Sequence, residues 1–180
     1  GETTNEAALR AVGDAGVLAM IGDSTNATVE GEAGSEADVR DSLQELIGGF
    51  TDRVAFACFA SNIARVQTVA EVAHAHGRAV GLVGRSLWRM TEAARATGYL
   101  RDLPPFVRED EAMQLPRDKV ALICTGSQGE PRAALSRIAR DDHPNITLDD
   151  GDTIIFSSRI IPGNEVSIGR LQNQLTAMGV

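Results

Sequence analysis

The chain has 180 residues, enough for one domain of ordinary size with a single sizeable hydrophobic core. Its composition, 43% hydrophobic and 23% charged, is that of a soluble globular protein, and no apolar run approaches the ~20 residues of a membrane-spanning helix. The formal net charge of −8 argues against a generally basic nucleic-acid-binding surface, so contact with a polyanion requires a local basic patch. The N-terminus has no signal-peptide layout, and we expect one domain over residues 1–180, in the cytoplasm.

The first elements predicted are a short helix at residues 5–12 and a strand at residues 17–21. The strand is an uninterrupted apolar run that leads into the loop Gly22-Asp23-Ser24-Thr25-Asn26. Ligands bind at the carboxyl ends of strands in an open α/β sheet, so this loop would bring the Asp23 carboxylate to a binding edge. The alternative is that these polar side chains only satisfy the backbone of a turn.

Strands and helices alternate through the rest of the chain. Further strands are predicted at residues 54–59, a fully apolar run, and at residues 78–83, 120–124 and 153–156. Apolar stripes at helical spacing predict helices at residues 36–47, 63–76, 86–97, 109–113 and 132–140, with a last helix carrying Val166, Leu171 and Leu175. Ser61 or Asn62 is predicted to cap the second of these helices, and Ser86 the third.

This alternation predicts an α/β fold, with a mostly parallel sheet of about five strands and helices on both faces. Each predicted strand is followed by a small polar loop, and loops after parallel strands share one edge of the sheet. The loops are GDSTN (22–26), ASN (60–62), GRS (84–86), TGSQGEP (125–131) and SSR (157–159), the last leading into IPGN (161–164).

Helix N-termini and Ser, Thr and Asn side chains at such an edge favour anion binding, and Arg65, Arg85, Arg132 and Arg159 can supply charge. Phosphate or a phosphodiester backbone is the ligand that suits this lining. The alternative is that all five loops are ordinary helix caps. No GxxxxGK[ST] or GxGxxG motif supports a P-loop or a Rossmann dinucleotide site, and no Ser/His/Asp order suggests a hydrolase triad.

Cys58 and Cys124 both lie in predicted strands, which favours buried free thiols over a disulfide or a metal pair. The histidines, His74, His76 and His143, have no metal-ligand spacing with these cysteines. We therefore expect no metal site in this chain.

Six motifs occur in order along the chain: GDSTN (22–26), FASNI (59–63), GRS (84–86), TGSQGEP (125–131), ALSRIA (134–139) and IPGNE (161–165). In type and order they resemble RNase J, a family of bacterial metallo-β-lactamase-fold ribonucleases with an inserted β-CASP domain. The similarity covers essentially the whole chain and concerns the β-CASP part only.

The resemblance implies a full-length enzyme that cleaves RNA with two zinc ions, held by an HxHxDH motif, further histidines and a bridging aspartate in the metallo-β-lactamase half. None of those motifs is in this sequence, so zinc is expected in the full-length enzyme and not in this chain. Asp23 matches the first acidic motif of the β-CASP family, which implies a carboxylate at the active-site edge that orients a histidine beside the metals. Ser61 and Asn62 match the segment that lines the RNA channel.

We therefore expect an excised β-CASP domain that closes over the missing metallo-β-lactamase domain and forms one wall of a channel for single-stranded RNA. The RNA-binding edge would comprise Ser61, Asn62, Arg85, Ser86, Ser127 and Gln128. The intact protein would be a 5′-to-3′ exonuclease, with or without endonuclease activity, and a homo-oligomer with no membrane partner. The alternative is a non-catalytic phosphate- or nucleotide-binding α/β module, and an HxHxDH motif just upstream in the intact gene would decide between them.

Overall fold

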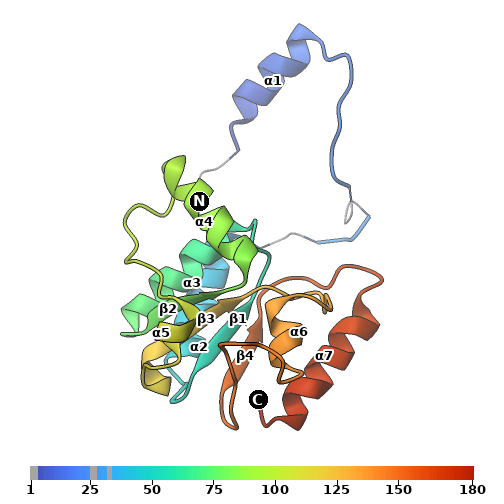
Figure 1. The fold of residues 1–180 in the computed structure, drawn as a ribbon. Helices are drawn as coiled ribbons and strands as arrows, with labels where there is room; N and C mark the ends of the chain where they lie inside the picture. The colour runs from blue at the N-terminus through green and yellow to red at the C-terminus, as the bar shows by residue number, and fades with distance from the viewer. Residues whose placement is uncertain (1–3, 25–27, 32–33) are drawn as a thin grey trace.

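The computed structural model describes residues 4–24, 28–31 and 34–180. Within these residues four strands form one all-parallel sheet in the order β2-β3-β1-β4 (Figure 1). The strands are β1 (Val54–Ala57), β2 (Ala79–Val83), β3 (Val120–Cys124) and β4 (Thr153–Phe156). Cys124 pairs in register with Val83 and Ala57, and Ala57 with Phe156, so all four strands end together at one edge.

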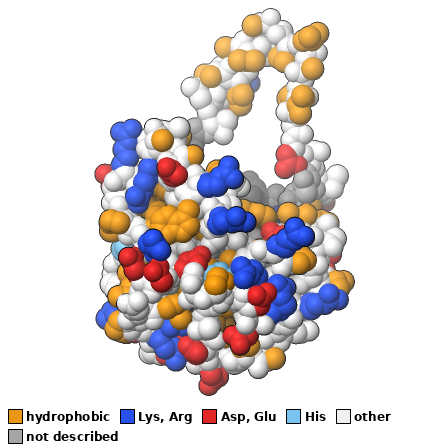
Figure 2. All heavy atoms as spheres, in the orientation of Figure 1, with side chains coloured by type: hydrophobic (Ala, Val, Ile, Leu, Met, Phe, Trp, Pro, Cys, Tyr) orange, Lys and Arg blue, Asp and Glu red, His pale blue; other side chains and the backbone are white. Residues whose placement is uncertain are grey.

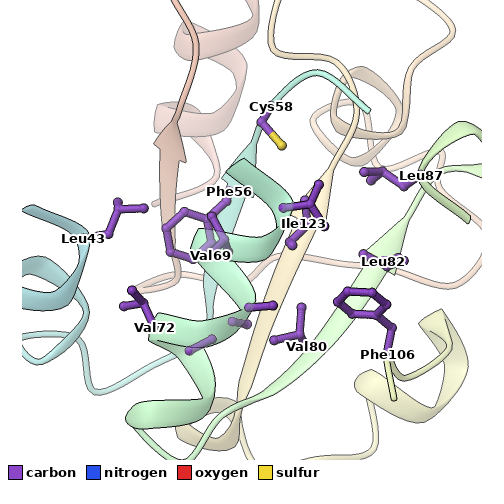
Figure 3. Packing of buried hydrophobic residues seen from close by; sticks show 14 of the residues in the cluster. Leu43, Phe56, Cys58, Val69, Val72, Val80, Leu82, Leu87, Phe106 and Ile123 are labelled. Atoms are coloured by element: carbon purple, nitrogen blue, oxygen red, sulfur yellow. The ribbon is translucent and has the colours of Figure 1, made fainter. Parts of the chain in front are cut away.

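Helices cover both faces of the sheet, which confirms the predicted α/β class. In chain order they are α2 (Glu36–Ile47), α3 (Ile63–Ala75), α4 (Arg85–Ala96), α5 (Glu109–Ala112), the 3-10 turn η1 (Arg117–Lys119), α6 (Ala134–Ile138) and α7 (Glu165–Ala177). One core packs α2, α3 and α4 against Phe56 and Ile123 (Figure 3). The other packs α5, α6 and α7 against Ala55 and Leu122. Because both faces are covered, β1 and β3 are buried throughout, as their continuous apolar runs predict.

The N-terminal part of the chain lies outside this body. Helix α1 (Glu6–Ala15) has no buried residue, and Figure 1 shows it projecting from the body together with the chain that follows it. Residues 17–21 form no strand, and Leu18 and Ile21 are fully exposed, at 105% and 100%. Strand formation requires a partner for the backbone N–H and C=O groups, and none of the described strands pairs with this segment. The strand predicted here is therefore wrong, and the sheet has four strands among the described residues instead of five.

Helix starts agree with the sequence at two predicted positions. Ser35 and Asp38 form a reciprocal capping box at α2, and the Asn62 side chain accepts from the backbone N–H of Arg65 at α3. Two short polar stretches thus fix where these helices begin.

Two further predictions about helices are wrong. Ser86 does not cap α4, because Gly84 has a φ of 122° and turns the chain directly from β2 into a helix that begins at Arg85. The helix predicted at residues 132–140 is only five residues long, from Ala134 to Ile138, because the preceding residues are held as turns.

The opposite edge of the sheet, at the amino ends of the strands, is held by a buried ionic network. The Asp152 carboxylate is fully buried and accepts from Arg53, at 2.7 Å, and from Arg117, at 2.8 Å. The Arg53 side chain is itself only 4% exposed. The charges buried at this edge pair with one another, which leaves the carboxyl edge as the candidate functional surface.

Candidate nucleic-acid interface

The loops that follow neighbouring strands are joined at the carboxyl edge. The backbone N–H of Ser157, after β4, donates to the carbonyl of Ala57 in β1 at 2.8 Å, and that of Thr125, after β3, donates to the carbonyl of Val83 in β2 at 3.2 Å. A Cβ at Gly84 would lie 2.7 Å from the Thr125 hydroxyl oxygen, so only glycine allows these two loops to approach so closely. Four of the five predicted polar loops therefore converge.

The fifth loop does not follow a strand of the sheet. Asp23 lies in the exposed N-terminal segment that projects from the body (Figure 1), and Thr25 and Asn26 lie outside the described residues. The expected place of Asp23 at the end of a strand is wrong, whereas its role in an intact enzyme stays a prediction.

Gln128 connects the loops after β3 and β4. Its amide nitrogen donates to the Ser158 hydroxyl at 3.2 Å and to the Arg159 carbonyl at 2.9 Å. Its amide oxygen accepts from the backbone N–H of Ile161 at 2.9 Å and from the Asn164 amide at 3.2 Å. All the bonding capacity of this side chain is therefore directed inward.

Gln128 and Ser127 are 4% and 2% exposed, so neither offers side-chain surface to a ligand. The Ser127 hydroxyl has no hydrogen-bond partner among the described residues. These two predicted site residues shape the edge from within, and their contact with RNA stays a prediction.

The other predicted pair, Ser61 and Asn62, begins α3. Ser61 is exposed, whereas the Asn62 side chain is used as the helix cap. Arg65, one turn along, pairs with Glu36 at 2.8 Å and donates to the Ser157 carbonyl at 2.8 Å, so its charge is already balanced. Partial burial acts to raise the pKa of Glu36, but the hydrogen bonds and charge of Arg65 hold that pKa below its ordinary value.

Several arginines gather at the ends of β2 and β3. There a hollow of about 720 Å³, named here the arginine hollow, is lined by Arg85, Arg89, Arg132 and Arg137. Arg85, Arg89 and Arg132 are exposed, and none of them makes an ion pair or hydrogen bond within the described part of the chain. Figure 2 shows basic side chains gathered over α4 and α6 on this face of the body. Predicted site residues Arg85 and Ser86 both line the hollow.

Two carboxylates and one histidine also line the arginine hollow. Glu109 accepts from the backbone N–H of Gly84 at 3.3 Å, and Glu130 accepts from that of Gln128 at 3.0 Å. Burial lowers the pKa of His143, which favours the neutral ring, and its Nδ1 accepts from the backbone N–H of Ile146. Arg137 pairs with Asp142 at 3.5 Å, so three unpaired guanidinium groups face two carboxylates and leave the hollow positively charged.

The start of α4 adds to this field. No side chain caps the helix, so the backbone N–H groups of Arg85 and Ser86 are available to an anion, whereas that of Leu87 donates to the Gly84 carbonyl. A local positive site thus exists on a chain whose net charge is −8. Guanidinium groups bind phosphate bidentately, and phosphate is the ligand that this arrangement suits.

No group of three or more His, Cys, Asp or Glu side chains in the described part of the chain could hold a metal ion. Cys58 and Cys124 are free and buried, as predicted, and burial raises the pKa of the Cys58 thiol to about 11 and that of Cys124 well above its ordinary range. None of the helices in residues 4–24, 28–31 and 34–180 is long and apolar enough to cross a membrane.

Arg89 and Arg137 are site residues that were not among those predicted from the sequence. Arg89 lies four residues after Arg85, a spacing that puts both side chains on one face of a helix and was available in the sequence. Arg137 gave no such signal, because only the crossing of α6 over the sheet brings it to this edge.

Comparison with known proteins agrees with this architecture. A family model described as Ribonuclease J, beta-CASP domain, matches residues 51–175. Over 180 residues the chain is 48% identical to Ribonuclease J of Sinorhizobium meliloti, covering 100% of this chain and 32% of that protein. It is 47% identical to Ribonuclease J of Corynebacterium glutamicum, covering 99% of this chain and 25% of that protein. It is 37% identical over 169 residues to Ribonuclease J2 of Bacillus subtilis, covering 93% of this chain and 30% of that protein.

The chain therefore spans a third or less of the length of these curated relatives. The match begins at residue 51, after the projecting segment and α2. On these findings the chain belongs to the β-CASP domain family of ribonuclease J.

Proposed function

We propose that the full-length protein is a zinc-dependent ribonuclease acting as a 5′-to-3′ exonuclease, and that this chain forms one wall of its RNA channel. The arginine hollow is the observation that supports a place for this chain in the wall of the RNA channel. Three exposed arginines without ion partners in the described structure, next to uncapped helix amides, suit the phosphates of an RNA strand. Long-range repulsion from the net charge of −8 is screened beyond ~8 Å at physiological salt, so these local contacts decide binding.

Zinc does not fit the residues described here, because they contain no cluster of three metal-ligating side chains. We therefore assign the metal to the part of the longer protein outside this chain. The role of this chain's own residues is to bind and orient RNA.

The exposed N-terminal segment provides the contact with that remaining part. Leu18, Met20 and Ile21 are 105%, 89% and 100% exposed, and apolar side chains in such a run are normally buried. A run of five apolar residues suits a strand that pairs in a neighbouring sheet. We assign residues 17–21 to the interface with the metallo-β-lactamase domain.

Asp23 directly follows this run, so the same docking would bring its carboxylate to the junction of the two domains. There it acts as a positioning residue. Asp23→Asn in the full-length enzyme should keep the zinc content and melting temperature while lowering turnover. An Asp23→Asn variant that unfolds the protein would show instead that the carboxylate only stabilises a turn.

The test of the enzymatic proposal compares the full-length protein with the 180-residue chain. Full-length protein should contain zinc by elemental analysis and degrade 5′-phosphorylated RNA, and a chelator should abolish the degradation. The chain alone should do neither. Metal-dependent RNA cleavage by the 180-residue chain, or two zinc ions bound to it, would refute the proposal that the metal site lies outside this chain.

A further inference from the structure

A second hollow adjoins the arginine hollow. It has a volume of about 430 Å³ and is lined by Trp88, Arg108, Glu109, Asp110 and Asn145. Glu109 lines both hollows, and Asn145 follows directly after His143 and Pro144, which line the first. The two hollows are therefore neighbours separated by one carboxylate side chain.

Helix α4 supplies side chains to both hollows from one face. Arg85, Trp88 and Arg89 stand at positions i, i+3 and i+4, so their side chains share one face of the helix. The indole Nε1 donates to the Leu82 carbonyl at 3.2 Å, which fixes the orientation of the ring. A half-buried, oriented indole beside a positive hollow suits a flat heterocycle attached to a phosphate.

Glu109 and its neighbours determine which of the two hollows suits the phosphate and which suits the base. Its oxygens accept from Gly84 N–H at 3.3 Å and from the Asn145 amide at 3.0 Å. The Asn145 amide oxygen makes no hydrogen bond within the described residues, so it can accept from a ligand. Among the residues that line this second hollow, the one cation, Arg108, is paired with Asp110 at 3.2 Å, so a phosphate is directed to the unpaired arginines of the first hollow.

We propose that the two hollows form one nucleotide site, with the phosphate held by Arg85, Arg89 and Arg132 and the base stacked on Trp88 within hydrogen-bond reach of Asn145. The ligand is a nucleoside 5′-phosphate group, either free or as one residue of an RNA strand. The inference rests on the proposed function only for RNA as a source of that group.

Trp88 is the single tryptophan of the chain, so its fluorescence reports on this site directly. The 180-residue chain should be titrated with adenosine monophosphate, with ribose 5-phosphate, and with a 5′-phosphorylated tetranucleotide. Adenosine monophosphate and the tetranucleotide should quench Trp88 emission saturably. Ribose 5-phosphate should compete with both without quenching, because it carries the phosphate and no base.

Variants separate the two halves of the site. Arg89→Gln should raise the Kd for adenosine monophosphate about tenfold, and Asn145→Ala should raise it severalfold. Arg170→Gln serves as the matched control, because Arg170 is an exposed arginine of α7 that lines neither hollow and makes no ion pair within the described residues. Its affinity should equal that of the parent chain.

The outcomes distinguish the proposed nucleotide site from the proposed role of this chain as one wall of the RNA channel. Quenching by adenosine monophosphate alone assigns the site to a free nucleotide and overturns RNA as its source. Arginine-dependent binding of the tetranucleotide without any change in Trp88 emission overturns the base position while leaving the RNA wall intact. Absence of saturable binding by every probe overturns both.

Discussion

Residues 17–21 and β1 (Val54–Ala57) are both short apolar runs, yet the first is exposed and the second is buried. β1 lies between β3 and β4 and is fully buried, with α2, α3 and α4 on one face and α6 and α7 on the other. Residues 17–21 pair with no described strand and are exposed along their length. The same sequence signal thus gives a core strand in one region and a projecting segment in the other. The difference is the presence of neighbours that can satisfy the backbone.

The largest expected effect tests whether the body is closed by its buried ionic network. Asp152→Asn removes the closer of the two carboxylates that pair with buried Arg53 and leaves only Asp149, at 3.5 Å, which should lower the free energy of unfolding by about 3 kcal/mol. Urea unfolding of the 180-residue chain measures this. Asp41→Asn, an exposed position on α2, is the control and should stay within about 0.5 kcal/mol of the parent. A loss at Asp152 no larger than that control would mean that this edge is open to water.

The buried thiols of Cys58 and Cys124 predict that the stability of the body depends on pH. Burial raises the pKa of Cys58 from 9.0 to about 11 and raises that of Cys124 as well, so the folded chain keeps both protons where the unfolded chain loses them. The free energy of unfolding should therefore fall as the pH rises from 9 toward 11, by up to about 1.4 kcal/mol per pH unit for each thiol.

Chemical denaturation between pH 8 and pH 11 checks this, with the double variant Cys58→Ala/Cys124→Ala as the control. The variant should lose most of the slope attributable to the thiols. An identical slope in both proteins would show that the two strands carrying these cysteines are not enclosed as described.

The smallest effect is expected in the projecting segment. Ile21→Ser should change the stability of the 180-residue chain by less than about 0.5 kcal/mol, because the side chain is fully exposed. In the full-length protein the same change should be clearly destabilising, because the segment is then buried at the domain interface. Parallel urea titrations of the two proteins measure the difference. Equal, negligible effects in both proteins would contradict the proposed docking of residues 17–21 on the metallo-β-lactamase domain.

Much of the body could be predicted from the sequence because its strands are covered on both faces, which leaves unbroken apolar runs such as Val120–Cys124. Helix starts were visible where a side chain caps the helix, as at Asn62. The start of α4 was not, because a positive φ at Gly84 replaces the cap expected from Ser86. The strand predicted at residues 17–21 is wrong for a different reason. An apolar run forms a strand only beside a partner strand, and the sequence of the run does not specify that partner.

The site was predictable only in outline. Convergence of the loops follows from parallel strands, and Arg85 follows from its place directly after β2. The inward turn of Gln128 depends on hydrogen bonds to Ile161 and Asn164, more than thirty residues away. The grouping of Arg137 with Arg85 likewise depends on how α6 packs, which local spacing cannot show.

The most direct test of the central claim is the salt dependence of RNA affinity in the full-length protein. The combined variant Arg85→Gln/Arg89→Gln/Arg132→Gln should bind single-stranded RNA more weakly. Its slope of log affinity against log salt should be smaller by about 2, at ~0.7 for each lost phosphate contact. Arg170→Gln should match the parent protein, and zinc content should be unchanged in both. An unaltered affinity and slope in the triple variant would contradict the assignment of the arginine hollow to RNA.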